Sequence, residues 1–286
     1  MTLGNRPVSL PPHETAPLED TRERTLPPER DLAVSPGRIH AEESVYLKQV
    51  ALYRMAATYS DDKRVLDLGC GEGYGTDLVA RTARQVVGAD RSWEVVAHAA
   101  TKYAGRNTCF VVCDAQRLPF RATSFQTVIS FEVIEHVRDV SSYLREIQRV
   151  CAAGAPALLS TPNRLLRLLP FQRPWNRFHL REYDARGLES ELRAVFRNVH
   201  LQGVIGTPEV MALEKRRVKQ NPFIAYPRMI AQLALPPSLY DRLKPRRKER
   251  GPAVNGFSSE ERISAEDYII SDRELRECIT LVAVCR

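Results

Sequence analysis

The stretch Val65-Leu66-Asp67-Leu68-Gly69-Cys70-Gly71-Glu72-Gly73-Tyr74-Gly75 is the strongest structural signal in this chain of 286 residues. It joins a short apolar run, typical of a buried strand, to a turn with a glycine at every second position. Glycines let the backbone bend tightly and let a ligand approach main-chain N–H groups that a Cβ atom would obstruct. A helix is expected to begin directly after the turn. The stretch therefore predicts a ligand cradle between a strand and a helix.

The spacing of these glycines separates two kinds of nucleotide cradle. Dinucleotide-binding enzymes use G-x-G-x-x-G, which would need a glycine at position 74, where this chain has Tyr74. The pattern here is G-x-G-x-G, with Asp67 two residues before the first glycine and Asp90 at the end of the next apolar run. This resembles the S-adenosylmethionine (SAM) cradle of class I methyltransferases. A Rossmann-like domain whose loop binds another nucleotide, or nothing, is the alternative.

The resemblance implies a set of cofactor-binding residues at three strand ends: Asp67, Gly69, Gly71, Gly73, Asp90, Asp114 and Ala115. The first acid and the glycines would hold the methionine end of SAM. Asp90 would accept hydrogen bonds from both ribose hydroxyls, because a carboxylate has two accepting oxygens. Asp114 would receive the adenine amino group. In such enzymes a preceding helix covers the cofactor, and Tyr53-Arg54-Met55-Ala56 resembles the family's R-Y-x-x-A segment, with Leu52 in place of its arginine.

Apolar runs and helical patterns alternate along most of the chain. Strands are predicted at 64–68, 85–89, 108–112, 127–131, 155–160, 199–205 and 279–284, and helices at 93–103, 140–150 and 184–194. Such alternation predicts an α/β fold with a parallel sheet between two layers of helices. The resemblance specifies it as a Rossmann-like, doubly wound, three-layer α/β/α fold with seven strands, the last one antiparallel. Ligands of such sheets bind at the carboxyl ends of the strands.

Composition divides the chain into four parts. Residues 1–37 carry seven prolines among charges and are predicted to be a disordered arm. The SAM-binding core spans 38–207 and opens with one or two helices. An insertion at 208–272 separates it from the final strand of the core, at 273–286.

Basic charge is concentrated around this insertion. Between Arg164 and Arg250 there are 19 Lys or Arg and 8 Asp or Glu, and clusters at 215–219 and 244–250 flank an apolar run at 223–235. Cations around an apolar element suit an anionic membrane surface or a lipid-linked substrate. RNA phosphates would suit the charge, but the aromatic residues expected of a single-strand platform are sparse. An ordinary solvated basic face is the third interpretation.

A second motif, Phe131-Glu132-Val133-Ile134-Glu135-His136, follows the fourth predicted strand. In a helical turn Glu132, Glu135 and His136 would project from one face. Two carboxylates and an imidazole can hold a divalent cation such as Mg²⁺, Mn²⁺, Fe²⁺ or Zn²⁺. Alternatively, Glu132 shapes the cofactor pocket, Glu135 favours a helix N-terminus, and His136 is a satisfied structural histidine or a general base without metal.

This run resembles the E-V-I-E-H motif of ubiquinone-pathway O-methyltransferases and of small-RNA 3′-terminal ribose methyltransferases. In the latter, a histidine after a T-P-N element completes a metal site, and here Thr161-Pro162-Asn163 precedes His179. The resemblance thus implies Glu132, Glu135, His136 and His179 as metal ligands. The stretch 175–183 also resembles the P-x-H-x-x-E-Y segment of bacterial methyltransferases that modify glycans and cell-surface sugars.

These patterns predict a SAM-dependent O-methyltransferase that modifies a hydroxyl of a glycan, sugar-containing or quinone-like metabolite. The methyl carbon of SAM is already electrophilic, so an alcohol acceptor mainly needs alignment and removal of its proton. His136 and Glu132 are the expected catalytic residues. RNA ribose 2′-O-methylation is the alternative function, and intact Asp67, Asp90 and Asp114 disfavour a non-enzymatic adaptor. Without a long apolar segment or a secretory leader, we expect a cytoplasmic protein, peripheral at the inner membrane surface if the insertion docks there.

Overall fold

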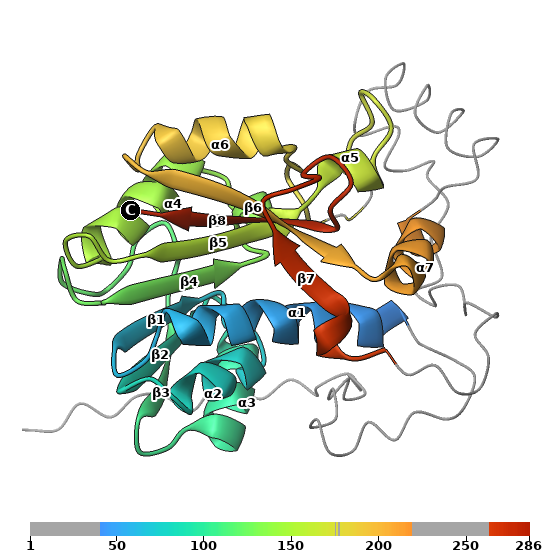
Figure 1. Cartoon of the computed structure of the whole chain (residues 1–286). Helices are drawn as coiled ribbons and strands as arrows, with labels where there is room; N and C mark the ends of the chain where they lie inside the picture. Colours follow the sequence, from blue (N-terminus) through green and yellow to red (C-terminus); the bar gives the residue numbers. More distant parts are fainter. Residues whose placement is uncertain (1–40, 175, 177, 219–262) are drawn as a thin grey trace, which may run out of the picture. The chain divides into compact units, whose positions relative to one another are not determined.

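An eight-stranded mixed β-sheet carries the fold (Figure 1). The structure is a computed structural model that describes residues 41–174, 176, 178–218 and 263–286, so the predicted arm at 1–37 and positions 219–262 of the insertion lie outside the described residues. The strands are β1 Arg64–Leu68, β2 Gln85–Asp90, β3 Thr108–Val112, β4 Thr127–Phe131, β5 Ala157–Pro162, β6 Val199–Gly206, β7 Tyr268–Ser271 and β8 Thr280–Cys285. Their order in the sheet is β3-β2-β1-β4-β5-β8-β6-β7.

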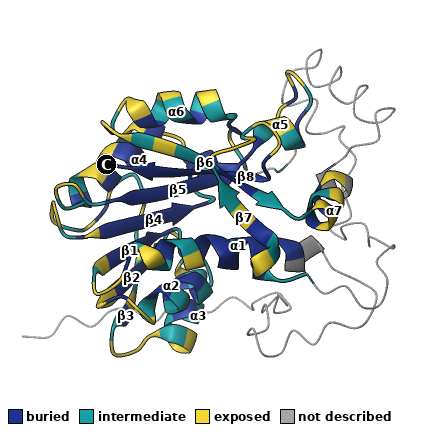
Figure 2. Ribbon diagram, in the orientation of Figure 1, coloured by how far each residue is buried: buried dark blue, intermediate teal, exposed yellow. Residues whose placement is uncertain are grey.

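Helices cover both faces of this sheet, which confirms the predicted three-layer Rossmann-like architecture (Figure 1). The helices are α1 Ala41–Thr58, α2 Tyr74–Ala80, α3 Trp93–Tyr103, α4 Val140–Val150, α5 Arg164–Arg167, α6 Ala185–Arg193 and α7 Pro208–Val218, with short 3₁₀ turns at Ile134–His136 and Ala265–Asp267. Figure 2 shows the central strands almost wholly buried; every residue of β4, β5 and β8 is buried. Such strands give continuous apolar runs, which explains why their positions were predictable.

Alternate residues of β1 face the two helical layers, as strand geometry requires. Leu66 and Leu68 join the apolar cluster that contains residues of α4 and α6. Asp67 lies between them and faces the other way, where it meets the hydroxyl of Tyr53 on α1. The sequence therefore places one acid on the α1 side of an otherwise apolar strand.

The sheet has eight strands rather than the predicted seven. The last strand of the chain, β8, is antiparallel to β5 and β6, as predicted. The additional strand is β7, which pairs with β6 at the edge of the sheet and comes from the segment assigned to the insertion. It has only four residues, Tyr-Ile-Ile-Ser, and such a run is too short to be told from a loop by periodicity.

The parallel strands end at one edge of the sheet and so gather the residues that follow them. In the register, Leu68 pairs with Ala89, Asp90 with Val112, and Phe131 with Ser160. The glycine turn, Asp90 and Glu132 therefore lie along the same edge. Among the helices that the structure describes, none is both long and apolar enough to cross a membrane.

Helix α2 packs so closely beneath α1 that only a glycine fits at position 75. A Cβ atom there would lie 2.1 Å from the ring of Tyr53. We expect Gly75→Ala to destabilise the protein by about 1–3 kcal/mol, the usual cost of overpacking. The free energy of unfolding, measured in urea, gives the size of this destabilisation. Gly105→Ala is the matched control, since its Cβ would have no neighbour closer than 3.9 Å; equal stability of the two variants would contradict the packing described here.

Candidate functional site

The glycine turn leaves an open approach to the backbone at one position. Gly69, Gly71 and Gly73 all have positive φ angles, of 81°, 52° and 87°, in a region that favours glycine. A Cβ atom at Gly69 would lie 2.3 Å from Val133, whereas one at Gly71 would meet nothing within 4 Å. Gly69 thus allows close packing, while Gly71 exposes a bare peptide unit. A ligand can approach the turn at Gly71.

Asp90 stands beside this open peptide. Its Oδ2 accepts the N–H of Gly71 at 3.2 Å, and its Oδ1 accepts the N–H of Ser92 at 3.0 Å. The carboxylate is half-buried and retains free lone pairs for hydroxyl donors. Asp114 lies exposed after β3, where it binds Gln116, and Ala115 follows it half-buried. These residues fit the ribose and adenine contacts that the resemblance to SAM enzymes implies.

The side chain of Asp67 contacts other side chains of the protein. Its side chain is fully buried and accepts hydrogen bonds from Thr76 at 2.6 Å and from Tyr53 at 3.1 Å. Burial raises the pKa of this carboxyl to about 6. The predicted contact between Asp67 and the methionine end of SAM stays a prediction. The structure gives Asp67 a further role, because it ties α1 and α2 together beneath the turn.

Glu132 lies at the end of β4 in a strained conformation. Its φ of 57° is unusual for a residue other than glycine, and such strain is typical of functional sites. Its carboxylate lies 3.4 Å from Nζ of Lys48 on α1 and accepts from Ser160 and Thr280. Lys48 is 5% exposed and also donates to Thr280 at 2.9 Å. A buried ion pair therefore joins α1 to the end of β4.

The cluster of ligand atoms within 4.8 Å of one another contains Glu135 and His136 but not Glu132. The expected helical turn begins later, as the 3₁₀ turn Ile134–His136, and Glu132 keeps its left-handed backbone before it.

Lys48 was missed by the sequence analysis. A signal existed, because Lys48 is the only charged residue between positions 44 and 53 of an otherwise apolar helix.

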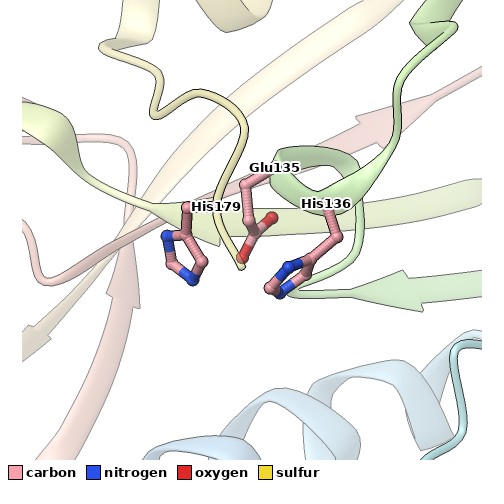
Figure 3. Close-up of side chains that lie close together, drawn as sticks. All are labelled: Glu135, His136 and His179. Atoms are coloured by element: carbon pink, nitrogen blue, oxygen red, sulfur yellow. The ribbon is translucent and has the colours of Figure 1, made fainter. Parts of the chain in front are cut away.

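His136 and His179 face each other across the site, with perpendicular rings 4.8 Å apart (Figure 3). Nδ1 of His136 lies 2.9 Å from the carbonyl oxygen of Phe178, and Nδ1 of His179 lies 2.9 Å from Glu182. Glu182 is fully buried and paired with Arg167 at 3.2 Å. Because carbonyl and carboxylate oxygens accept hydrogen bonds, Nδ1 of each ring is the donor. In His136, whose pKa burial lowers, Nε2 then keeps its lone pair at neutral pH.

Glu135 completes this group, with its carboxylate between the two rings (Figure 3). Oε2 accepts from Thr161 at 3.0 Å, whereas Oε1 is buried without a hydrogen-bond partner among the described residues. Burial and the charge of Glu132 raise the pKa of Glu135 to about 8. Burial lowers the pKa of His136. At neutral pH the site therefore combines a protonated carboxyl with an unprotonated imidazole.

The three side chains fit a divalent cation. One ligand atom from each of Glu135, His136 and His179 lies within 4.8 Å of the other two. Imidazole nitrogens and a carboxylate oxygen suit Zn²⁺, Fe²⁺ or Mn²⁺. Proteins commonly orient such histidines through a hydrogen bond from the other ring nitrogen, as Phe178 and Glu182 do here. Three of the four predicted ligands thus converge, and Glu132 is the exception.

Comparisons with known proteins found similar sequences and a similar fold. A family model described as methyltransferase domain matches residues 66–159. A Mycobacterium tuberculosis protein described as a probable SAM-dependent methyltransferase is 33% identical over 214 residues, covering 74% of each chain. A ubiquinone biosynthesis O-methyltransferase of Rhizobium rhizogenes is 35% identical over 106 residues, covering 36% of this chain and 43% of that protein. The crystal structure of the cyclase SpnF shares the fold with a TM-score of 0.52 at 18% identity, covering 89% of this chain and 88% of that one.

The position of Asp90 predicts the effect of removing its charge. We expect Asp90→Asn to weaken SAM binding about 10- to 100-fold, the loss expected for hydrogen bonds to a charged acceptor. Isothermal titration calorimetry measures the affinity. Asp77→Asn is the control, because Asp77 forms a surface ion pair with Arg81. Unchanged affinity in Asp90→Asn would exclude Asp90 from the ribose contact.

The ion pair between Lys48 and Glu132 predicts a shift in pH dependence. The charge of Glu132 raises the pKa values of Glu135 and His136, and Lys48 lowers that of Glu135. In Lys48→Met the negative charge is no longer compensated, so both pKa values rise. We expect the acid limb of the activity profile to move to higher pH, with Lys48→Arg close to wild type. Identical profiles for Lys48→Met and wild type, with folding checked by thermal unfolding, would contradict this coupling.

Proposed function

The chain belongs to the SAM-dependent methyltransferases, and on that premise we propose that it transfers the methyl group of SAM to a hydroxyl of a glycan, sugar-containing or quinone-like metabolite. The observation that carries the proposal is the pair of histidines at the carboxyl edge of the sheet, each held through Nδ1 and without a hydrogen bond from the described residues to Nε2. A neutral amine can attack the methyl carbon before it loses a proton, whereas a hydroxyl is a weak nucleophile unless a base takes its proton as the new bond forms. The similarity to an O-methyltransferase of ubiquinone biosynthesis supports the same conclusion.

The residues of the glycine turn would hold the cofactor. Asp90 would accept from the ribose hydroxyls, the exposed Asp114 and Ala115 would flank the adenine, and the open peptide at Gly71 would lie against the ligand. When bound there, SAM supplies an electrophilic methyl carbon. Buried Asp67 acts through Tyr53 and Thr76, which fix the two helices around the turn.

His136 is the group best placed to take the proton of the acceptor. Its lowered pKa keeps the ring unprotonated at neutral pH, and its hydrogen bond to Phe178 fixes the tautomer with the lone pair on Nε2. The acceptor hydroxyl would pass its proton to this atom while the new carbon–oxygen bond forms. His179, held by Glu182, would orient the hydroxyl or a neighbouring one. Glu132 would act on the site by its charge, and not by contact with the cation ligands.

We extend this proposal to include a divalent cation bound at the histidine pair. Glu135, His136 and His179 would bind it, and the cation would lower the pKa of the acceptor hydroxyl. The unpartnered Oε1 of Glu135 supports this arrangement, since a buried oxygen without a donor is costly unless a proton or a metal ion satisfies it. Binding would displace the proton of Glu135, so affinity for the cation would rise with pH. Vicinal diols and catechols are the acceptors that such a site would suit best.

The chemical nature of the product tests the proposal. We expect labelled methyl groups from SAM, incubated with the enzyme and fractionated host extract, to appear as methyl ethers in NMR spectra. Products carrying the label on nitrogen or carbon would contradict O-methylation, and label recovered in RNA would assign the acceptor to ribose.

Removal of the His136 imidazole should lower the rate of methyl transfer without weakening SAM binding. We expect His136→Gln to reduce kcat about 10²- to 10⁴-fold, the range for a missing general base, with SAM affinity close to wild type. The control is His200→Ala, at the start of β6 and far from the carboxyl edge. Equal turnover by His136→Gln and His200→Ala would exclude His136 from the reaction.

Metal depletion distinguishes a mechanism that requires the cation from one in which His136 acts as a base alone. If the cation is required, a chelator should abolish turnover, and one of Mg²⁺, Mn²⁺, Fe²⁺ or Zn²⁺ should restore it in wild type but not in His179→Ala. Full turnover in excess chelator would reject the cation and leave His136 as a simple base.

A further inference from the structure

The chain between β5 and α6 forms an excursion that covers the histidine pair. We name residues 164–182 the rim loop, of which the structure describes all but positions 175 and 177. Its base is closed where the N–H of Arg164 donates to the carbonyl of Tyr183 at 2.8 Å. Its inner side meets the site, because Phe178 binds His136 and the N–H of Leu180 donates to the carbonyl of Glu135 at 2.8 Å. The outer side is therefore the surface next to the catalytic residues.

The rim loop carries several exposed apolar side chains. Among the described residues seven large hydrophobic side chains are exposed, and four of them lie on this loop: Leu165 (46%), Phe171 (80%), Phe178 (57%) and Leu180 (49%). Single exposed apolar residues are common on proteins, but clustering within one short loop marks an interaction site. Phe171 also has a φ of 63°, a strained conformation for an aromatic residue. The most exposed aromatic side chain of the loop therefore lies on a backbone conformation that is unfavourable in free energy.

The same loop is strongly basic. The sequence from 164 to 181 contains five arginines and no aspartate or glutamate. The first acid, Glu182, is buried and already engaged by Arg167 and His179. The exposed Arg173 lies two residues from Phe171. A partner of this surface must therefore accept apolar side chains and carry negative charge.

We propose that the rim loop docks the protein on an anionic lipid bilayer. Phe171 and Leu165 enter the boundary between headgroups and acyl chains, while the exposed Arg173 lies against lipid phosphates. Exposed leucines favour a bilayer over single-stranded nucleic acid, whose bases stack on aromatic rings and gain little from aliphatic side chains. Docking in this orientation presents the histidine pair to molecules at the membrane surface. The docking itself does not depend on which atom of the acceptor is methylated.

Vesicle flotation of the full chain tests this proposal. We expect binding to phosphatidylcholine vesicles that contain phosphatidylglycerol, weaker binding as salt rises, and none to phosphatidylcholine alone. Phe171→Ser with Leu165→Ser should lower the partition coefficient at least tenfold, because the apolar contact is removed. Arg173→Glu should weaken binding to the anionic vesicles as well.

Two exposed apolar residues outside the rim loop provide matched controls. Trp93→Ser and Ile269→Ser remove side chains that are 68% and 58% exposed, and they should bind vesicles as wild type does. All variants retain residues 219–262, so any contribution of those residues is common to them, and thermal unfolding verifies that each variant folds. Equal loss in the controls, binding to neutral vesicles, or no binding by wild type would overturn the proposal. Retention of single-stranded RNA in place of vesicles, lost in the rim-loop variants, would assign the loop to nucleic acid.

Discussion

The common edge at which the parallel strands end is the constraint on which the site depends. The turn after β1, Asp90 at the end of β2 and Glu132 after β4 meet there because the register of the strands leaves no other place for them. Hydrogen bonds across this edge then fix individual groups, as Asp90 does with the peptide of Gly71. The rim loop closes over the same edge through Phe178 and Leu180. Cofactor cradle and histidine pair are thus two halves of one surface.

Charge within this surface is balanced by few groups. Glu132 and Glu135 are close enough for the first to raise the pKa of the second, and Lys48 is the cation that offsets them from α1. Ser44, one turn before Lys48 on α1, is hydrogen-bonded to Glu214 of α7 and Tyr268 of β7. Burying such groups is unfavourable unless each finds a partner. Helix α1 therefore joins both ends of the predicted insertion to the carboxyl edge of the sheet.

Local sequence predicted most of the fold and part of the site. Apolar runs located β1, β3 and β4 to the residue, because buried strands need continuous hydrophobic sequence. The glycine pattern and the histidine after T-P-N pointed to residues that the structure brings to one edge. Lys48 was not foreseen, since its contact with Glu132 links distant segments. Glu182 lies only three residues after His179, but the sequence does not show which way the two side chains point. The orientation of Glu132 was missed because its left-handed backbone is imposed by its surroundings and not by its own preference.

The most direct test of this account is a crystal structure of the full chain with S-adenosylhomocysteine, the demethylated form of the cofactor. The account predicts both ribose hydroxyls on the carboxylate of Asp90, the backbone of Gly71 against the ligand, and the sulfur facing the side on which His136 and His179 lie. A ligand bound elsewhere, or one whose sulfur faces away from both histidines, would contradict it.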